Sequence, residues 1–156
     1  MEDNLLEFLV ESNAIEEEFS KSAAVDAIRA WKYGVKNKEN MHLEVVRGIH
    51  YQLMRRINLP ISGKIRKVQV SVGKEICMQP EKIYDSLTRW CAIYNSDKTW
   101  DYIKKRHIEF LKIHPFEDGN GRTGRILMNL QRINAGMEIL VIHVGDEQSK
   151  YYKWFN

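Results

Sequence analysis

The sequence predicts a mainly α-helical single domain that carries one small β-hairpin. Apolar residues recur at three- and four-residue spacings over most of the chain, which is the period of amphipathic helices. One short segment alternates instead, between glycines, which is typical of a strand in a hairpin. A length of 156 residues is that of one domain able to bury a core without covalent staples.

Two helices are expected in the first half of the chain. Residues 22–33 place Val25, Ile28 and Trp31 three apart, which puts them on one face of a helix. Residues 42–57 repeat that spacing. Each pattern is longer than an ordinary strand, so both segments are interpreted as core-facing helices.

Three further helices are expected in the second half. One should start after Pro80, and the next should be capped by Asp97 or Thr99. The last long helix should cover residues 121–135 and stop at Gly136, because glycine readily adopts the left-handed conformation that ends a helix.

The predicted strand covers residues 65–72, which form an alternating segment. Val68, Val70 and Val72 share one face, and polar residues take the other. An unpaired edge here could bind an extended peptide of a target through main-chain hydrogen bonds. Alternatively, the hairpin merely covers the core. The full segment is Ile65, Arg66, Lys67, Val68, Gln69, Val70, Ser71 and Val72.

Charge is unevenly distributed along the chain. Residues 1–18 carry seven acids and no Lys or Arg, so the remainder has 24 bases and 14 acids, a net charge of +10. A basic body favours an anionic ligand such as a nucleotide or a nucleic acid. The acidic segment is either a solvated helix or an internal competitor for that ligand.

The location expected from the sequence is the cytoplasm. The N-terminus lacks the basic start and apolar run of a signal peptide, and no apolar stretch approaches the ~20 residues that span a bilayer. Cys77 and Cys91 show neither a pairing pattern nor metal-ligand spacing. A membrane partner is therefore not expected.

The segment that carries chemistry is residues 114–125, which read HPFEDGNGRTGR. A glycine-rich loop leads into a helix, where free N–H groups favour anions and glycines allow a phosphate to approach. Arg122 and Arg125 are three apart and project from one side of the helix. Two guanidiniums beside such a loop suit a polyphosphate.

Two more residues of this segment favour phosphoryl or nucleotidyl transfer. Asp118 can hold a magnesium ion that bridges phosphates. His114 can take a proton near neutral pH, because the ordinary pKa of histidine is about 6.5. The stretch also satisfies G-x-G-x-x-G, but no strand and no βαβ unit precede it, so a dinucleotide-binding fold is not predicted.

Residues 114–125 resemble the signature of the Fic family, His-Pro-Phe-x-Asp/Glu-Gly-Asn-Gly/Lys-Arg, at every fixed position. The helical organisation of residues 22–136 and the segment before Pro80 are similar to that family too. The resemblance implies a Fic-like helical fold and an enzyme that moves AMP from ATP to a Ser, Thr or Tyr hydroxyl of a target protein.

The family pattern assigns roles to these positions. His114 would be the general base, Asp118 would bind Mg²⁺, and Arg125 would hold the γ-phosphate of ATP. The hairpin would be a flap that docks the target. The phosphate-binding set would be Gly119, Asn120, Gly121, Arg122, Gly124 and Arg125.

Residues 12–16 resemble the family's inhibitory motif, Ser/Thr-x-x-x-Glu-Gly/Asn. In that pattern the glutamate, here Glu16, pairs with Arg125 and replaces its contact with the γ-phosphate. Ser12 matches the first position, whereas Glu17 stands where Gly or Asn is expected. The resemblance divides the chain into an N-terminal inhibitory segment, residues 1–20, and a catalytic domain, residues 21–156.

Helical geometry gives independent support to the inhibitory role. A helix over residues 5–19 would place Leu5, Phe8, Leu9, Ile15 and Phe19 on one apolar stripe that also contains Glu16. A lone acid on an apolar face needs a buried partner. The alternative is a capping box, in which Asn13 and Glu16 start a helix.

Other functions stay open. A glutamate at position 16 could instead assist removal of AMP from modified protein, and some family members transfer other phosphate-containing groups. A basic helical nucleic-acid-binding module is a different class, but no helix shows a Lys/Arg stripe with interleaved aromatics. A homo-oligomer is left open.

Overall fold

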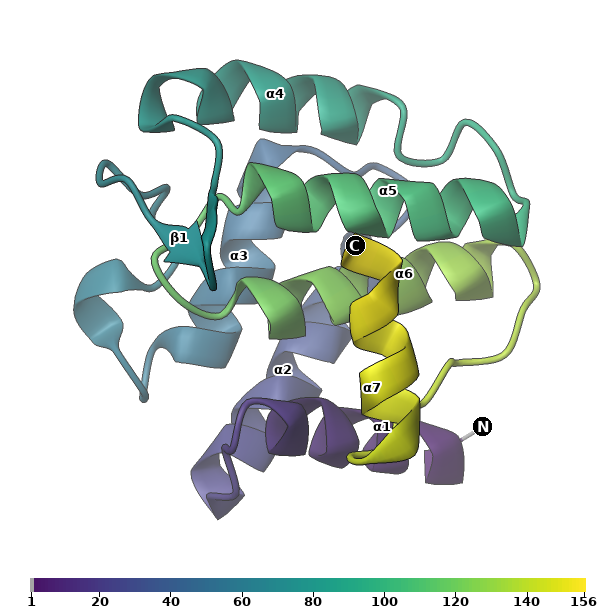
Figure 1. The fold of residues 1–156 in the computed structure, drawn as a ribbon. Coiled ribbons are helices and arrows are strands. Elements are labelled where there is room, and N and C mark those ends of the chain that lie inside the picture. The colour runs from purple at the N-terminus through teal and green to yellow at the C-terminus, as the bar shows by residue number, and fades with distance from the viewer. Residues whose placement is uncertain (1) are drawn as a thin grey trace.

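The structure is a computed structural model that describes residues 2–156, so Met1 of the predicted N-terminal segment lies outside the described residues. Over this range the chain is mainly helical, with a two-stranded antiparallel hairpin, as the sequence predicts (Figure 1). The helices are α1 (Glu2–Ile15), α2 (Lys21–Asn37), α3 (Leu43–Met54), α4 (Pro80–Ala92), α5 (Trp100–Ile113), α6 (Asn120–Asn134) and α7 (Asp146–Tyr152).

Helix α6 lies at the centre of the molecule (Figure 1). It contacts α1, α2, α3 and α5, and eleven of its fifteen residues are buried. The core around it is built from the apolar faces of α3, α4 and α5. Helix α6 begins directly after the glycine-rich loop, so the candidate phosphate-binding residues are fixed by the best-packed element of the fold.

Local sequence signals define several helix ends as expected. The Thr99 hydroxyl accepts a hydrogen bond from the backbone N–H of Tyr102 and caps α5. After α6, Gly136 adopts a φ of 76°, which confirms it as the stop signal. Helix α2 extends beyond residues 22–33 at both ends, whereas α3 ends at Met54 and leaves Ile57 outside.

The prediction of a strand over residues 65–72 is largely wrong. Strand β1 covers only Ser71–Val72, and it pairs with β2, Glu75–Ile76. Before Ser71, residues that would share one face of a strand differ in burial: Arg66 is buried, whereas Val68 is 51% exposed. Hydrogen bonds from Arg66 to the carbonyls of His114 and Ile113 tie this part of the chain to the end of α5, so it follows that end and is not part of a regular strand.

The prediction of a helix over residues 5–19 is correct only as far as Ile15. Phe19 lies beyond the helix and is 76% exposed, so it does not belong to the apolar stripe. The capping-box alternative is wrong, because Asn13 lies in the last turn of α1 and α2 has Ser20 as its N-cap. A turn after Ile15 therefore carries Glu16.

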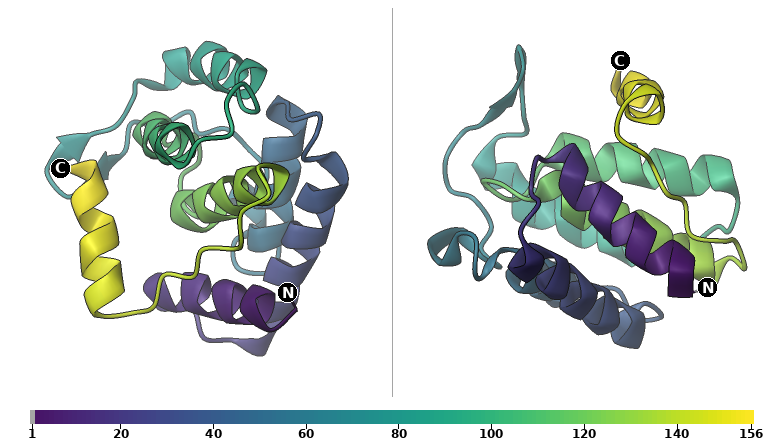
Figure 2. Two further views of the ribbon diagram at one scale, coloured as in Figure 1. Left: turned by 90° about the vertical axis from the view of Figure 1, so that its right-hand side faces the viewer. Right: turned by 90° about the horizontal axis from the view of Figure 1, so that it is seen from below.

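Helices α1 and α7 flank α6, as the three views show (Figure 2). Phe8 of α1 is buried and meets Trp31 of α2 edge to face, with ring centroids 5.9 Å apart. On the exposed side, His143 lies 2.7 Å from a carboxylate oxygen of Glu7. Among the described helices, none combines the length and apolar character needed to cross a bilayer.

Candidate active site

His114 stands at the end of α5, in a left-handed conformation with φ 51° and ψ 61°. Its Nδ1 lies 3.2 Å from the carbonyl oxygen of Leu111. Because a carbonyl can only accept, Nδ1 carries the proton and Nε2 keeps a free lone pair. Burial, aided by the positive charge of Arg66, lowers the pKa of His114 from its ordinary value. The imidazole is therefore a neutral base at pH 7.

The loop after His114 is closed by hydrogen bonds between its own groups. The Asn120 side chain accepts from the backbone N–H of Phe116 at 2.9 Å and donates to the Phe116 carbonyl at 2.8 Å. Gly119 has a φ of 81°, and a Cβ there would lie 2.8 Å from Met54 Sδ. Asn120 therefore shapes the loop through its side chain, and Gly119 is required by conformation and by space.

His50 of α3 supports this loop from behind. The backbone N–H of Gly63 donates to its Nδ1 at 2.9 Å, so Nε2 carries the proton and donates to the Asp118 carbonyl at 2.7 Å. The ring also stacks on Phe116, with centroids 3.7 Å apart. Burial lowers the pKa of His50 to about 4. Spacing alone gave no signal for this role, because its partners are 13 and 68 positions away in the chain.

Arg122 is buried but poorly paired. Its guanidinium donates to the thioether sulfur of Met54 at 3.2 Å, and thioethers are weak acceptors. Its Nε is buried and has no hydrogen-bond partner among the described residues. A buried cation in this state favours an anionic ligand at the loop.

Arg125, three residues further on, is fully engaged by the turn at the end of α1. Its Nε donates to Ser12 Oγ at 2.9 Å, and one terminal nitrogen donates to the Ser12 carbonyl at 3.0 Å and to Glu16 Oε1 at 2.8 Å. The guanidinium is 2% exposed, whereas the Glu16 side chain is 39% exposed. The structure thus brings together Ser12, Glu16 and Arg125.

The Glu16 carboxylate also lies directly over the loop. A Cβ placed on Gly121 would be 2.5 Å from Glu16 Oε1 and 3.0 Å from an Arg125 nitrogen. A carboxylate oxygen therefore already occupies the space that the glycine leaves open beside Arg125. Gly124, by contrast, faces α5, where a Cβ would lie 3.0–3.2 Å from Leu111, Phe110 and His107.

Asp118 is the one expected metal ligand. It is exposed, and one of its oxygens accepts from the backbone N–H of Gly119 at 2.7 Å, which leaves the other free. Within the described residues, no group of three or more His, Cys, Asp or Glu could hold a metal ion. A single free carboxylate fits Mg²⁺ of the kind that nucleotide phosphates carry with them.

The C-terminal helix α7 borders the site beside Arg125, and the segment that leads into it contacts α1. Tyr151 of α7 is buried, its hydroxyl lies 2.8 Å from His107 Nε2, and its ring lies 5.8 Å from the Arg125 guanidinium. Burial lowers the pKa of His107 to about 3. Tyr151 therefore packs in the core beside Arg125.

The predicted flap residues do not meet the loop as a group. Lys67, Gln69 and Ser71 are exposed, and Ile65 is half-buried against the core. Arg66 does reach the segment around His114, where its Nε donates to the His114 carbonyl. The tip of the hairpin exposes apolar side chains, with Val72 at 55% and Ile76 at 75%.

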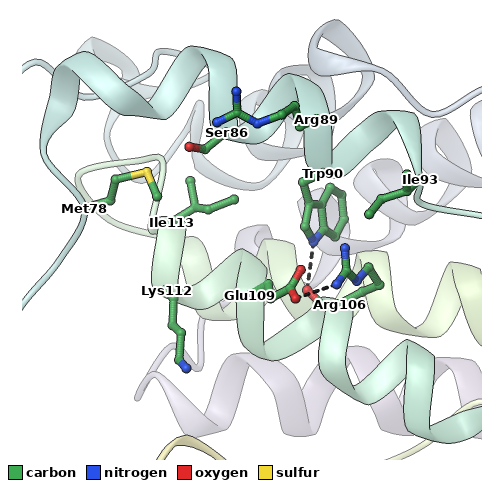
Figure 3. A pocket seen from close by; sticks show the side chains of 9 residues that line it. All are labelled: Met78, Ser86, Arg89, Trp90, Ile93, Arg106, Glu109, Lys112 and Ile113. Atoms are coloured by element: carbon green, nitrogen blue, oxygen red, sulfur yellow. Dashed lines mark hydrogen bonds and ion pairs between the residues drawn. The ribbon is translucent and has the colours of Figure 1, made fainter.

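A cavity of about 300 Å³ lies elsewhere, between α4 and α5 (Figure 3). Trp90 and Ile113 line it, and its basic side chains diverge, since Lys112 points away from Trp90. The Trp90 indole N–H donates to the Arg106 carbonyl at 2.8 Å. Because its cations do not converge, this cavity lacks the anion-binding character of the loop.

Comparison with known proteins adds independent findings. A family model described as the Fic/DOC family matches residues 40–131. Protein adenylyltransferase fic-1 of Caenorhabditis briggsae is 29% identical over 133 residues, which cover 81% of this chain and 26% of that protein. Protein adenylyltransferase Fic of Culex quinquefasciatus is 31% identical over 111 residues, which cover 68% and 22%. The chain thus spans about a quarter of the length of these relatives.

Solved structures share the fold. A Fic-domain-containing signalling protein from Bacteroides thetaiotaomicron matches with a TM-score of 0.81 at 21% identity, covering 97% of this chain and 70% of that one. Fic-1 from Caenorhabditis elegans matches with a TM-score of 0.76 at 18% identity, covering 98% and 55%. The family model over residues 40–131 and the 31%-identical relative from Culex quinquefasciatus show that the chain belongs to the Fic/DOC family.

Proposed function

We propose that this chain is the catalytic domain of a protein adenylyltransferase, which moves AMP from ATP to a hydroxyl of a target protein. The observation that carries the proposal is the convergence of His114, the glycine-rich loop, Arg122 and Arg125 at the junction of α5 and α6. The relatives named protein adenylyltransferase support it.

Each residue then has a defined task. Nε2 of His114 takes the proton of the target hydroxyl as its oxygen attacks the α-phosphorus of ATP, and the bond to the β-phosphate breaks to release pyrophosphate. Arg122 and the N-terminus of α6 hold the phosphates in line. Asp118 would hold Mg²⁺, which when bound neutralises phosphate charge. Arg125 holds the γ-phosphate.

The exposed hairpin is the proposed docking site for the target. Its outer edge could pair with an extended peptide, and the apolar side chains of Val72 and Ile76 offer contact area beside the backbone. This assigns the flap of residues 65–72, together with β2, a positioning role and little sequence specificity.

Residues 1–20 restrain this activity in the proposal. Glu16 occupies Arg125 and the space over Gly121, so a nucleotide would lose its γ-phosphate contact. A half-exposed ion pair alone supplies only about 0.2–1 kcal/mol. Docking of α1 supplies the rest, since burial of Phe8, Leu9 and Ile15 contributes roughly 1.5–3 kcal/mol each.

The experiment incubates wild type, Glu16→Gly and Glu16→Gly/His114→Ala with α-labelled ATP and Mg²⁺ in a cell lysate. We expect at least about tenfold more labelled protein with Glu16→Gly, which corresponds to about 1.4 kcal/mol of relieved restraint. The double variant should show none, because it lacks the base. Glu18→Gln, a neighbouring acid outside the ion pair, is the matched control and should equal wild type.

Three further measurements separate the alternative functions. Label that appears from γ-labelled but not α-labelled ATP would indicate phosphoryl transfer. Faster loss of AMP from labelled protein with wild type than with Glu16→Gly would indicate AMP removal. Salt-sensitive binding of DNA without use of ATP would favour a nucleic-acid-binding module.

A further inference from the structure

Arg66 is a second enclosed cation, besides Arg125, near the candidate base. It is 2% exposed, and within residues 2–156 its side chain bonds only to backbone carbonyls. Among the described residues no Asp or Glu contributes to its electrostatic surroundings. A buried guanidinium without a carboxylate is unfavourable unless the groups around it are fixed and well aligned.

Three successive carbonyls around His114 meet this residue. The Arg66 Nε donates to His114 O at 2.7 Å, and a terminal nitrogen donates to Ile113 O at 3.3 Å. Its own backbone N–H donates to Pro115 O at 3.0 Å. These carbonyls lie at the negative end of the α5 dipole, which replaces a carboxylate as the partner of the cation.

The same side chain holds both legs of the hairpin. One terminal nitrogen donates to Val68 O, before β1, at 2.9 Å, and the other donates to Met78 O, after β2, at 2.5 Å. Met78 and Ile113 also line one cavity, so the returning leg lies against the last turn of α5 (Figure 3). The guanidinium of Arg66 therefore joins the hairpin to the backbone of the candidate base.

We infer that Arg66 is a positioning residue, which holds His114 in its left-handed conformation and fixes the hairpin relative to it. A left-handed backbone at a residue other than glycine persists only where its surroundings impose it. Arg66 supplies that constraint on both sides of the residue. Its Nε donates to the carbonyl of His114, and its backbone N–H donates to the carbonyl of Pro115. The inference rests on the proposed function, because it assigns the base and the docking site their relative placement.

The test places Arg66→Lys and Arg66→Gln in the Glu16→Gly background. Lysine keeps the charge but cannot bond at once to the carbonyls at the end of α5 and to those of the hairpin. Glutamine also removes the charge. We expect kcat for self-modification to fall about 10–100-fold in both variants, because small misplacement of a catalytic group has effects of this size. The KM for ATP should change by less than about threefold, since the phosphate loop is untouched.

A second readout separates positioning from mere stability. The charges near the His114 imidazole are Arg66, Asp118 and Glu16, and Arg66 lowers the pKa of His114. In Arg66→Gln the acidic limb of the kcat profile, and the NMR titration of the His114 ring, should therefore move to higher pH. In Arg66→Lys both should stay near those of the parent.

The control is Arg106→Gln. Arg106 is a buried arginine of α5 that pairs with Glu109 and does not touch the loop. It should keep the kcat and pH profile of the parent. An unchanged kcat in Arg66→Lys, or loss of folding in both Arg66 variants, would overturn the inference. An inactive Glu16→Gly parent would instead contradict the proposed function itself.

Discussion

Glu17 occupies a turn whose backbone conformation is unfavourable for glutamate. It follows Glu16 with a φ of 57°, a left-handed conformation that disfavours side chains with a Cβ. The family motif expects Gly or Asn at this position, and these are the residues that tolerate such a backbone. The motif therefore has a conformational reason as well as an electrostatic one.

We expect Glu17→Gly to stabilise the protein by about 1 kcal/mol, because it removes strain at a left-handed position. This should raise Tm by about 2–4 °C in a domain of this size and lower basal AMP transfer. Thermal unfolding and the labelling assay measure both. Glu18→Gly is the control, since Glu18 has no positive φ, and it should not raise Tm. A lower Tm for Glu17→Gly would contradict the prediction.

At the scale of elements, α1 is held in place mainly by its apolar face. Phe8 and Leu9 are buried in the core shared with α2, α3 and α6, whereas Leu6 and Val10 face outward. The contact of Glu7 with His143 is exposed and adds little by comparison. The proposed restraint on Arg125 should therefore depend on packing at a distance from the ion pair.

We expect Phe8→Ala to release α1 and to raise AMP transfer toward the level of Glu16→Gly. Truncating a buried Phe typically costs about 3–5 kcal/mol, which is comparable to the docking of one short helix. Hydrogen exchange should show loss of protection in α1 with α6 still protected. Leu6→Ala, at a 54% exposed position of the same helix, should behave like wild type. Exposed α1 without increased transfer would show that α1 is not the restraint.

Across the whole molecule, two buried histidines connect the site to stability. His50 and His107 have pKa values lowered by burial to about 4 and about 3, whereas an unfolded histidine titrates near 6.5. Between these values the unfolded chain binds more protons than the folded one. Stability should therefore fall as pH decreases from about 6.5 toward 4.

The slope should approach 1.4 kcal/mol per pH unit for each of the two histidines, by the usual linkage relation, which is about 3 for these two together. His114, whose pKa burial also lowers, acts in the same sense. Urea unfolding at pH 7, 6 and 5 measures the slope. His107→Gln should roughly halve the slope, because one of the two buried sites then cannot titrate. His143 acts in the opposite sense, since its carboxylate partners raise its pKa to about 9, and its contribution is lost only as pH rises through that value. A flat profile from pH 7 to 5 would contradict the prediction.

The elements that depend on local chemistry could be predicted from the amino-acid sequence. Apolar periodicity predicted the central helices, Thr99 and Gly136 marked helix ends, and the run from His114 to Arg125 indicated phosphate chemistry, because its residues act within a few positions of one another. The Glu16–Arg125 pairing followed from family resemblance rather than from spacing.

The contacts between groups distant in the chain could be seen only in the folded molecule. The structure shows that Arg66 and His50 lie around the loop and that Tyr151 lies beside Arg125. It also shows that the strand predicted for residues 65–72 is much shorter. The physical reason is that a buried polar group must find its partner wherever the fold supplies one. Such partners lie tens of positions apart, where periodicity and motif spacing carry no information.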